Sequence, residues 1–315
     1  MTSPRRVLIL GGSGFVGRHA CERLARAGWQ ITVPTRRLAH AACVQHLPGL
    51  TVLEADIHER ATLCHLLPGH DAVVNLVAVL HGNAARFERT HVELPNKLAQ
   101  ACLSTGVTRL LHVSALGADP TRCDSAPSLY LRSKSRGEAV LRAAEGLQLT
   151  VLRPSVIFGA DDRFLNLFAK LQSHFPLLPL AGSQARFQPV WVEDVAQAIV
   201  RCLDSVASIG RTYELCGPDV LMLAQLVELA GRASGHPRLI VPLPASLARL
   251  QAWLMELAPG EPLMSRDNLD SMRIDNVASG QQAGLSDLGI VPAAVAAIAK
   301  SYLGQQDRWV SLRSH

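Results

Sequence analysis

The sequence lacks the features that define several large classes of protein. Aromatic residues make up only 4% of its 315 residues, and lysine occurs only four times. No apolar run approaches the roughly 20 residues that a membrane-spanning helix needs. Basic residues are scattered, so the net charge of +5 does not indicate a nucleic-acid-binding protein. An apolar strand starts within the first few residues, and we therefore expect no signal peptide.

Cysteine is present, but its distribution argues against a disulfide framework. The seven cysteines are dispersed singly, which is typical of reduced thiols in a cytosolic protein. Cys43 with His46, or Cys64 with His65, suggests a metal site, but no second ligand pair stands at metal-site spacing. We therefore expect no bound metal and a cytoplasmic location.

Apolar segments alternate with helical patterns through the first half of the chain. Strands are predicted at residues 7–10, 31–33, 51–53, 72–77, 110–114 and 149–152, and helices at residues 16–27, 87–105 and 130–145. This alternation predicts an α/β protein with a Rossmann-type, doubly wound parallel sheet.

The pattern loosens after about residue 155, which predicts a second, smaller region. We expect a Rossmann domain over residues 1–155, to which residues 185–205 return, and a smaller C-terminal α/β cap over residues 156–315. The apolar stretch from Pro244 to Leu257 predicts a helix packed on its own domain, with a helix lying on a membrane surface as the alternative.

A glycine-rich turn lies between the first predicted strand and the first predicted helix. Its glycines fit two dinucleotide-binding spacings, Gly11–Gly14–Gly17 and Gly12–Gly14–Gly17. Glycine lets the backbone turn sharply and approach a pyrophosphate, and the helix N-terminus supplies N–H groups to that anion. A tight turn without a ligand is the alternative. The predicted contacts are Gly11, Ser13, Gly14, Phe15, Val16 and Gly17.

The carboxylate that usually ends the second strand and binds the ribose hydroxyls is missing. Arg36 and Arg37 stand there instead. Two guanidinium groups suit a 2′-phosphate, so the sequence predicts NADP(H) in preference to NAD(H), unless both arginines are solvated surface residues. Asp56 and Ile57, after the third strand, are predicted to contact adenine.

Tyr130 and Lys134 stand one helical turn apart on one face of a predicted helix. A phenol has an ordinary pKa near 10, and a nearby ammonium group and the cationic nicotinamide both favour the phenolate. We therefore expect Lys134 and the nicotinamide to lower the pKa of Tyr130, and Lys134 to bind the nicotinamide ribose. A surface tyrosine and lysine on an ordinary helix are the alternative.

These motifs occur in the order found in the extended and atypical short-chain dehydrogenases/reductases, which the chain resembles over about residues 5–200. The resemblance rests on the glycine turn, Asp56, residues 75–77, residues 113–115, Tyr130 with Lys134, and residues 153–155. Residues 112–118, 130–134, 155–159, 162–166 and 188–195 also resemble the nucleotide-binding accessory subunit of respiratory complex I and its bacterial relatives.

The resemblance implies a seven-stranded sheet with a bound dinucleotide. It implies Tyr130 as general acid/base, Lys134 as its activator, and Ser114 as the hydroxyl that orients a carbonyl. Further implied cofactor contacts are Leu76, Val77, Ala78, Pro154, Ser155 and Val156. Ala115 and Leu116 stand where the family often has a catalytic Ser or Thr, so Ser114 as a structural residue is the alternative.

Two functions follow from these observations. The first is an oxidoreductase or epimerase that acts on a carbonyl or hydroxyl through Tyr130 and Lys134. The second is a non-catalytic NADP(H)-binding structural or assembly protein, as the complex I likeness implies. His91 stands where many relatives have asparagine, which favours the second function. The apolar C-terminal region predicts a small apolar substrate, and association with a respiratory complex at the inner membrane is the alternative to a purely cytoplasmic location.

Overall fold

The computed structural model describes residues 4–257 and 262–303. Within these residues the chain folds into two compact units. The first unit comprises the residues up to Pro154, together with Glu193–Leu215 and Gly280–Ile290. The second unit comprises Ser155–Val192 and the described residues of 216–279 and 291–303.

A seven-stranded sheet forms the centre of the first unit. Its strands are β1 (Arg6–Leu10), β2 (Gln30–Thr35), β3 (Leu50–Glu54), β4 (Ala72–Asn75), β5 (Arg109–Val113), β6 (Gln148–Pro154) and β11 (Thr212–Leu215). The strand order is β11-β6-β5-β4-β1-β2-β3, and every pairing is parallel. The predicted Rossmann-type, doubly wound sheet is confirmed. Read from β3 to β6, the strands stand in the order 3-2-1-4-5-6 that defines this fold.

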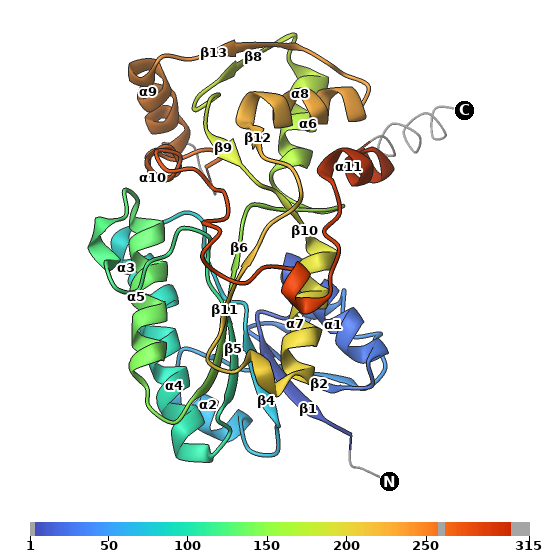
Figure 1. Cartoon of the computed structure of the whole chain (residues 1–315), viewed down its shortest axis with the longest axis vertical. Coiled ribbons are helices and arrows are strands. Elements are labelled where there is room, and N and C mark those ends of the chain that lie inside the picture. Colours follow the sequence, from blue (N-terminus) through green and yellow to red (C-terminus); the bar gives the residue numbers. More distant parts are fainter. Residues whose placement is uncertain (1–3, 258–261, 304–315) are drawn as a thin grey trace. The chain divides into compact units, whose positions relative to one another are not determined.

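Helices cover both faces of this sheet (Figure 1). The longer ones are α1 (Phe15–Arg26), α2 (Arg60–Leu66), α3 (Ala84–Glu88), α4 (Leu94–Thr105), α5 (Leu129–Ala143) and α7 (Val192–Asp204). The short 3-10 turns are η1 (Leu38–Ala41), η3 (Cys123–Ser125), η4 (Val206–Ser208) and η5 (Ser286–Leu288). Leu10, Val73 and Leu110 are fully buried in the core between the sheet and the helices α2, α4 and α5. Strands that are apolar on both faces need this double cover.

One predicted helix is interrupted in the structure. The sequence predicts a continuous helix over residues 87–105, whereas α3 and α4 are joined by the π-helical turn η2 (Arg89–Glu93). A π-helical turn inserts one extra residue per turn, and periodicity over a short window does not reveal it. The turn directs His91 into the interior, where it is 2% exposed.

The sheet reverses its winding between β1 and β4. β1 pairs with β2 on one side and with β4 on the other, so the chain leaves β1 and β4 in opposite directions. In doubly wound sheets the ligand crevice opens at this point, beyond the carboxyl ends of the strands. The fold therefore places the glycine turn after β1 and the loop after β4 at the expected crevice.

The start of α7 is tied to α1 by ionic hydrogen bonds. Glu193 accepts a hydrogen bond from His19 Nδ1 at 2.6 Å and one from Arg23 Nε at 2.7 Å. These hydrogen bonds and charges hold the pKa of the Glu193 carboxyl below its usual value. Glu193 thus links the start of α7 to α1, the helix that follows the glycine turn.

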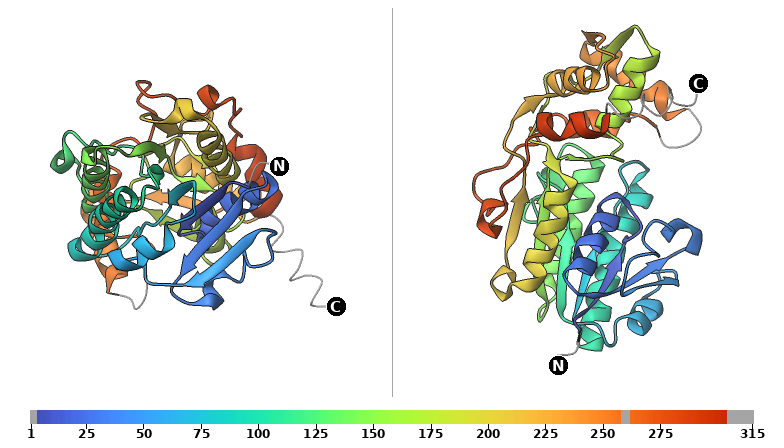
Figure 2. Two further views of the ribbon diagram at one scale, coloured as in Figure 1. Left: turned by 90° about the horizontal axis from the view of Figure 1, so that it is seen from below. Right: turned by 90° about the vertical axis from the view of Figure 1, so that its right-hand side faces the viewer.

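The second unit combines helices with two-stranded sheets (Figure 2). Its helices are α6 (Leu165–His174), α8 (Leu223–Ala233), α9 (Ala245–Glu256), α10 (Arg266–Ser271) and α11 (Val295–Leu303). Its strand pairs are β7 (Ile157–Phe158) with β10 (Val190–Trp191), β9 (Arg186–Phe187) with β12 (Leu221–Met222), and β8 (Leu177–Leu180) with β13 (Leu239–Pro242). Phe158, Leu165, Leu226 and Val295 belong to its apolar core.

The helix α9 buries Ala248 and Ala252 but exposes a row of leucines. We call this row, Leu247, Leu250, Leu254 and Leu257, the α9 apolar face; its side chains are 50–64% exposed. Within the described residues, none of the helices is long and apolar enough to cross a bilayer.

Candidate dinucleotide-binding and catalytic site

The glycine turn after β1 has the geometry that a phosphate site requires. Gly11 adopts a left-handed conformation with φ +82°, and its carbonyl accepts the Gly14 N–H at 3.0 Å. A Cβ on Gly17 would lie 2.2 Å from the Gly11 oxygen, so only glycine allows α1 to pack this closely on the turn. Gly12 is also constrained, because its Cβ would lie 2.7 Å from a methyl group of the Val33 side chain.

Gly14 differs from the other glycines of the turn. A Cβ there would meet only the Gly11 oxygen, at 3.3 Å, so the space in front of Gly14 is open. Gly14 is the N-cap of α1, which has no side-chain capping bond and no acidic residue in its first turn. The first N–H groups of α1 and the helix dipole can therefore face an anion. The residues present fit the pyrophosphate of a dinucleotide.

The adenosine end of the predicted site lies after β2 and β3. Arg36 and Arg37 follow β2 and are exposed. Asp56 is exposed after β3, and its Oδ1 accepts the N–H of His58 at 2.9 Å. Ile57 packs partly buried against the apolar core of the first unit. Parallel pairing of β2 with β3 brings these two predicted pairs to the same edge of the sheet.

The loop after β4 contacts the glycine turn. The Leu76 N–H donates to the Leu10 carbonyl at 2.9 Å, and the Val77 N–H donates to Asn75 Oδ1 at 3.2 Å. A Cβ on Gly11 would lie 3.3 Å from the backbone of Leu76 and Val77. Ala78 is exposed beyond this contact. The structure thus places the two predicted loops side by side.

Lys134 connects α5 to the carboxyl end of β5. Its side chain is 2% exposed, and Nζ donates to the Val113 carbonyl at 3.1 Å. Burial lowers the pKa of Lys134 to about 8, against the opposing effect of the Glu138 carboxylate. The next residue along β5 is Ser114, whose Oγ is buried and has no hydrogen-bond partner among the described residues. A buried hydroxyl of this kind is suited to bind a group from a ligand.

The Tyr130 phenol has the opposite pKa shift from the one that the sequence predicts. Burial raises its pKa to about 12. Lys134 by itself therefore does not lower the pKa as predicted, because burial outweighs any effect of the ammonium group. The predicted contribution of the cationic nicotinamide stays a prediction. Tyr130 is the second residue of α5. The N-cap of this helix, Ser128, accepts a hydrogen bond from the Leu131 N–H through its Oγ at 3.2 Å. At neutral pH the phenol is protonated and can donate a proton.

The structure adds buried polar residues for which the sequence predicts no role. His91 and Ser133 hydrogen-bond at 2.8 Å beneath Tyr130, and His112 Nδ1 hydrogen-bonds Asn75 Nδ2 at 3.2 Å. Burial and the Lys134 charge lower the pKa of His112 to about 3, so its ring is neutral. The available sequence signal was a histidine in an otherwise apolar strand or helix pattern.

The predicted cofactor contacts at and directly after the end of β6 are Pro154, Ser155 and Val156. They are divided between the two units. The Pro154 carbonyl belongs to the first unit and accepts the Leu116 N–H at 3.0 Å. Ser155 and Val156 belong to the second unit, where Asn276 Oδ1 accepts Ser155 Oγ at 2.6 Å and the Val156 N–H at 2.9 Å. The sequence did not indicate the role of Asn276, which lies 120 residues away from Val156.

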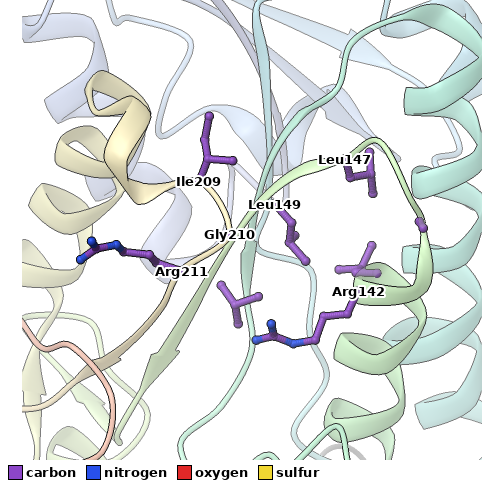
Figure 3. Close-up of a pocket in the computed structure, with 9 residues that line it drawn as sticks. Arg142, Leu147, Leu149, Ile209, Gly210 and Arg211 are labelled. Atoms are coloured by element: carbon purple, nitrogen blue, oxygen red, sulfur yellow. The ribbon is translucent and has the colours of Figure 1, made fainter.

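A hollow of about 210 Å³ lies near the amino ends of β6 and β11, away from the carboxyl ends where the glycine turn and the loop after β4 lie (Figure 3). Leu149 at the amino end of β6 and Gly210 before β11 line it. Ligands of such sheets bind at the carboxyl ends, and ligand pockets commonly have about 300 Å³ or more, so we assign this hollow no role. The described residues also contain no cluster of three or more metal-ligating side chains.

Comparison with solved structures shows the same fold. UDP-glucuronic acid 4-epimerase from Bacillus cereus, in complex with UDP-glucuronic acid and NAD, aligns over 96% of this chain and 99% of its own with a TM-score of 0.71 and 16% identity. Pal from Bacillus thuringiensis aligns over 97% and 99% with a TM-score of 0.74 and 16% identity.

Comparison with curated sequences shows relatives at higher identity. The chain is 32% identical to mitochondrial NADH dehydrogenase [ubiquinone] 1 alpha subcomplex subunit 9 of Mus musculus, over 90% of this chain and 76% of that protein. It is 31% identical to the ceramide reductase of Caulobacter vibrioides over 78% of each. Residues 7–216 match the model of a family described as NAD dependent epimerase/dehydratase. This chain belongs to the NAD dependent epimerase/dehydratase family.

Proposed function

We propose that the protein is an NAD(P)-dependent oxidoreductase that acts on a carbonyl or hydroxyl group, with Tyr130 as general acid/base. The observation that carries this proposal is the arrangement at the end of β5. There the Lys134 ammonium donates a hydrogen bond to the Val113 carbonyl. The Oγ of the next residue, Ser114, is buried without a hydrogen-bond partner among the described residues. Tyr130 lies one helical turn before Lys134 on α5.

Each predicted group has a distinct part in this proposal. The first N–H groups of α1 bind the pyrophosphate, Arg36 and Arg37 bind a 2′-phosphate, and Lys134 binds the nicotinamide ribose. When bound, the nicotinamide supplies or accepts a hydride. The further proposed cofactor contacts are Gly11, Ser13, Gly14, Phe15, Val16, Gly17, Asp56, Ile57, Leu76, Val77, Ala78, Pro154, Ser155 and Val156.

The protonated form of Tyr130 is the form that acts as an acid in carbonyl reduction. Burial raises the pKa of the phenol to about 12, so at neutral pH it carries the proton that reduction of a carbonyl oxygen requires. In this proposal Ser114 Oγ donates a hydrogen bond to the same oxygen. Two donors on one oxygen stabilise the negative charge that develops there during reduction.

The exposed arginines after β2 support a preference for NADP(H). Neither Arg36 nor Arg37 forms an ion pair with any of the residues that the structure describes, and no carboxylate replaces them at the end of β2. A guanidinium group binds a phosphate through paired N–H groups. We propose that these groups bind the 2′-phosphate that distinguishes NADPH from NADH.

An apolar substrate fits this assignment. The ceramide reductase of Caulobacter vibrioides, named for a lipid, is among the relatives. The second unit exposes the α9 apolar face. We propose a long-chain carbonyl compound as the substrate class.

The test compares wild type with Tyr130→Phe. We expect the variant to keep its affinity for NADPH, measured by nicotinamide fluorescence, and to lose about 10²–10⁴-fold in the rate of NADPH oxidation with long-chain ketones. Tyr213→Phe, on β11, is a matched control that should keep the rate. Equal rates in wild type and Tyr130→Phe would exclude Tyr130 as the acid.

A second function is supported by different observations. The chain is 32% identical to a subunit of mitochondrial NADH dehydrogenase, and Ala115 and Leu116 replace the hydroxyl residues expected after Ser114. In this alternative the dinucleotide stabilises the native chain without turnover, because it binds only the folded state. The α9 apolar face would then contact a respiratory complex at the inner membrane.

Two measurements distinguish the alternative from the enzyme. A non-catalytic protein gives no NADPH oxidation with any carbonyl compound, and it copurifies with a membrane complex in mild detergent. Replacing Leu250 and Leu254 of the α9 apolar face with serine should then abolish copurification while NADPH binding persists. Turnover with a carbonyl substrate and no copurification would reject this alternative.

A further inference from the structure

His91 lies between the loop after β4 and the first turn of α5. It lies in the π-helical turn η2, and such turns often occur at functional sites. The wider turn brings the imidazole into the interior of the first unit, where it is 2% exposed. The contacts of the imidazole are therefore with the surrounding protein and not with solvent.

The hydrogen bonds of His91 determine which ring nitrogen carries the proton. The Val79 N–H donates to His91 Nε2 at 3.1 Å, so Nε2 is an acceptor. The proton of the neutral ring is then on Nδ1, which donates to Ser133 Oγ at 2.8 Å. Ser133 Oγ in turn donates to the Tyr130 carbonyl at 2.8 Å. These three bonds connect the loop after β4 to the first turn of α5.

The surrounding charges keep this arrangement neutral. Burial first, and then the charge of Lys134, lower the pKa of His91 to about 2. A second proton on the ring would place an Nε2–H against the Val79 N–H, which also donates. At neutral pH the ring is therefore neutral, with its proton on Nδ1.

Packing around the ring restricts the same elements. The imidazole stacks on Phe87 with centroids 5.6 Å apart, and the Tyr130 ring meets it edge-on, also at 5.6 Å. A Cβ on Gly137 of α5 would lie 2.0 Å from the His91 carbonyl oxygen. Glycine at this position lets α5 approach the backbone of His91 closely.

We propose that His91 is a positioning residue that fixes the loop after β4 and the Tyr130 segment of α5 in one arrangement for the nicotinamide half of the cofactor. The inference rests on the proposed function for its consequence in catalysis. The link between Val79 and Tyr130 itself is a property of the protein without ligand, and it can be measured separately. His91 acts through these groups and does not contact the reacting atoms.

The first experiment measures the link in the protein without ligand. We expect the long-range ¹H–¹⁵N spectrum of the histidine rings to show a neutral Nδ1–H tautomer for His91, and the Val79 amide to exchange slowly with D₂O. His91→Leu and Ser133→Ala should each accelerate exchange at Val79 at least tenfold, whereas His174→Leu, an exposed histidine of the second unit, should not. An Nε2–H tautomer, or unchanged exchange in both variants, would overturn the proposal.

The second experiment measures the consequence for the site. We expect His91→Leu to weaken NADPH binding at least tenfold, and His91→Gln to restore most of the affinity, because its amide can accept from Val79 and donate to Ser133. Rescue by glutamine at equal stability distinguishes positioning from a merely structural effect. Lack of NADPH binding by wild type would reject the proposed function, and the exchange and tautomer results would still decide the role of His91.

Discussion

The four glycines of the phosphate turn have different roles, and one pair of substitutions tests this directly. Gly14→Ala adds a methyl group that meets only the Gly11 oxygen, at 3.3 Å. Gly17→Ala adds one that would lie 2.2 Å from the Gly11 oxygen and 2.6 Å from Gly12. We expect the first change to affect ligand binding and the second to affect the fold.

The magnitudes follow from these contacts. Gly14 has φ −78° and ψ 178°, which alanine adopts freely, so the change should cost under about 1 kcal/mol as a weaker N-cap. In our assignment the added methyl group lies where the pyrophosphate approaches, and overpacking of about 1–3 kcal/mol corresponds to about 5–150-fold weaker binding. Gly17→Ala places its methyl group against backbone atoms that cannot rotate away, so we expect about 3 kcal/mol or more of lost stability.

The assays are urea denaturation for stability and nicotinamide fluorescence for NADPH affinity. Gly284→Ala is a matched control, because its Cβ would meet only the Glu214 carbonyl, at 3.6 Å, in an ordinary van der Waals contact. It should change neither quantity appreciably. If Gly14→Ala binds NADPH as tightly as wild type, the turn is not the pyrophosphate site and the assignment of the first unit as a dinucleotide domain is refuted.

Three further predictions concern charged groups of the first unit. NADPH should bind at least about tenfold more tightly than NADH, and Arg36→Ala combined with Arg37→Ala should remove this preference in the same titration; equal affinities in wild type would make both arginines surface residues. Burial lowers the pKa of Lys134 from 10.5 to about 8, so the unfolded chain binds more protons between these pH values and stability rises with pH across this window. The difference in unfolding free energy between wild type and Lys134→Met should therefore change by about 3 kcal/mol from pH 8 to 10.5, and a constant difference contradicts the burial of a charged amine. Glu138→Gln weakens the bonds of 2.8 and 2.6 Å that the fully buried Glu138 accepts from Arg153, and removes the carboxylate that is hydrogen-bonded to that cation, so it should cost about 3 kcal/mol in urea denaturation. Recovery of that loss when Arg153→Met is added would confirm the pairing.

The sequence predicted the sheet well because the signals for it are local. Continuous apolar runs mark strands that are covered on both faces, and each of the predicted strands appears in the structure within a few residues of its predicted bounds. Glycine spacing marks a turn through the conformational freedom of individual residues, as Gly11 illustrates with its φ of +82°. Lys134 and Tyr130 were placed together by helical periodicity alone.

The environment of those same residues could not be predicted. The pKa of Tyr130 depends on how completely the fold removes water, and the structure raises it where the sequence pattern predicted a lowering. Asn276 binds the backbone after β6 from a distant part of the chain. His91 enters the interior only because η2 is π-helical, which periodicity does not reveal.

What the sequence by itself determined, therefore, is the type and order of the elements, the glycine turn after β1 and the one-turn spacing of Tyr130 and Lys134 on α5. Each of these depends on residues within a few positions of one another, through backbone freedom or helical and strand periodicity. Only the tertiary structure decided the buried contacts of Lys134 and His91, the unpartnered hydroxyl of Ser114 and the exposed α9 apolar face. These depend on which surfaces meet and exclude water, and that is settled by packing between segments far apart in the chain.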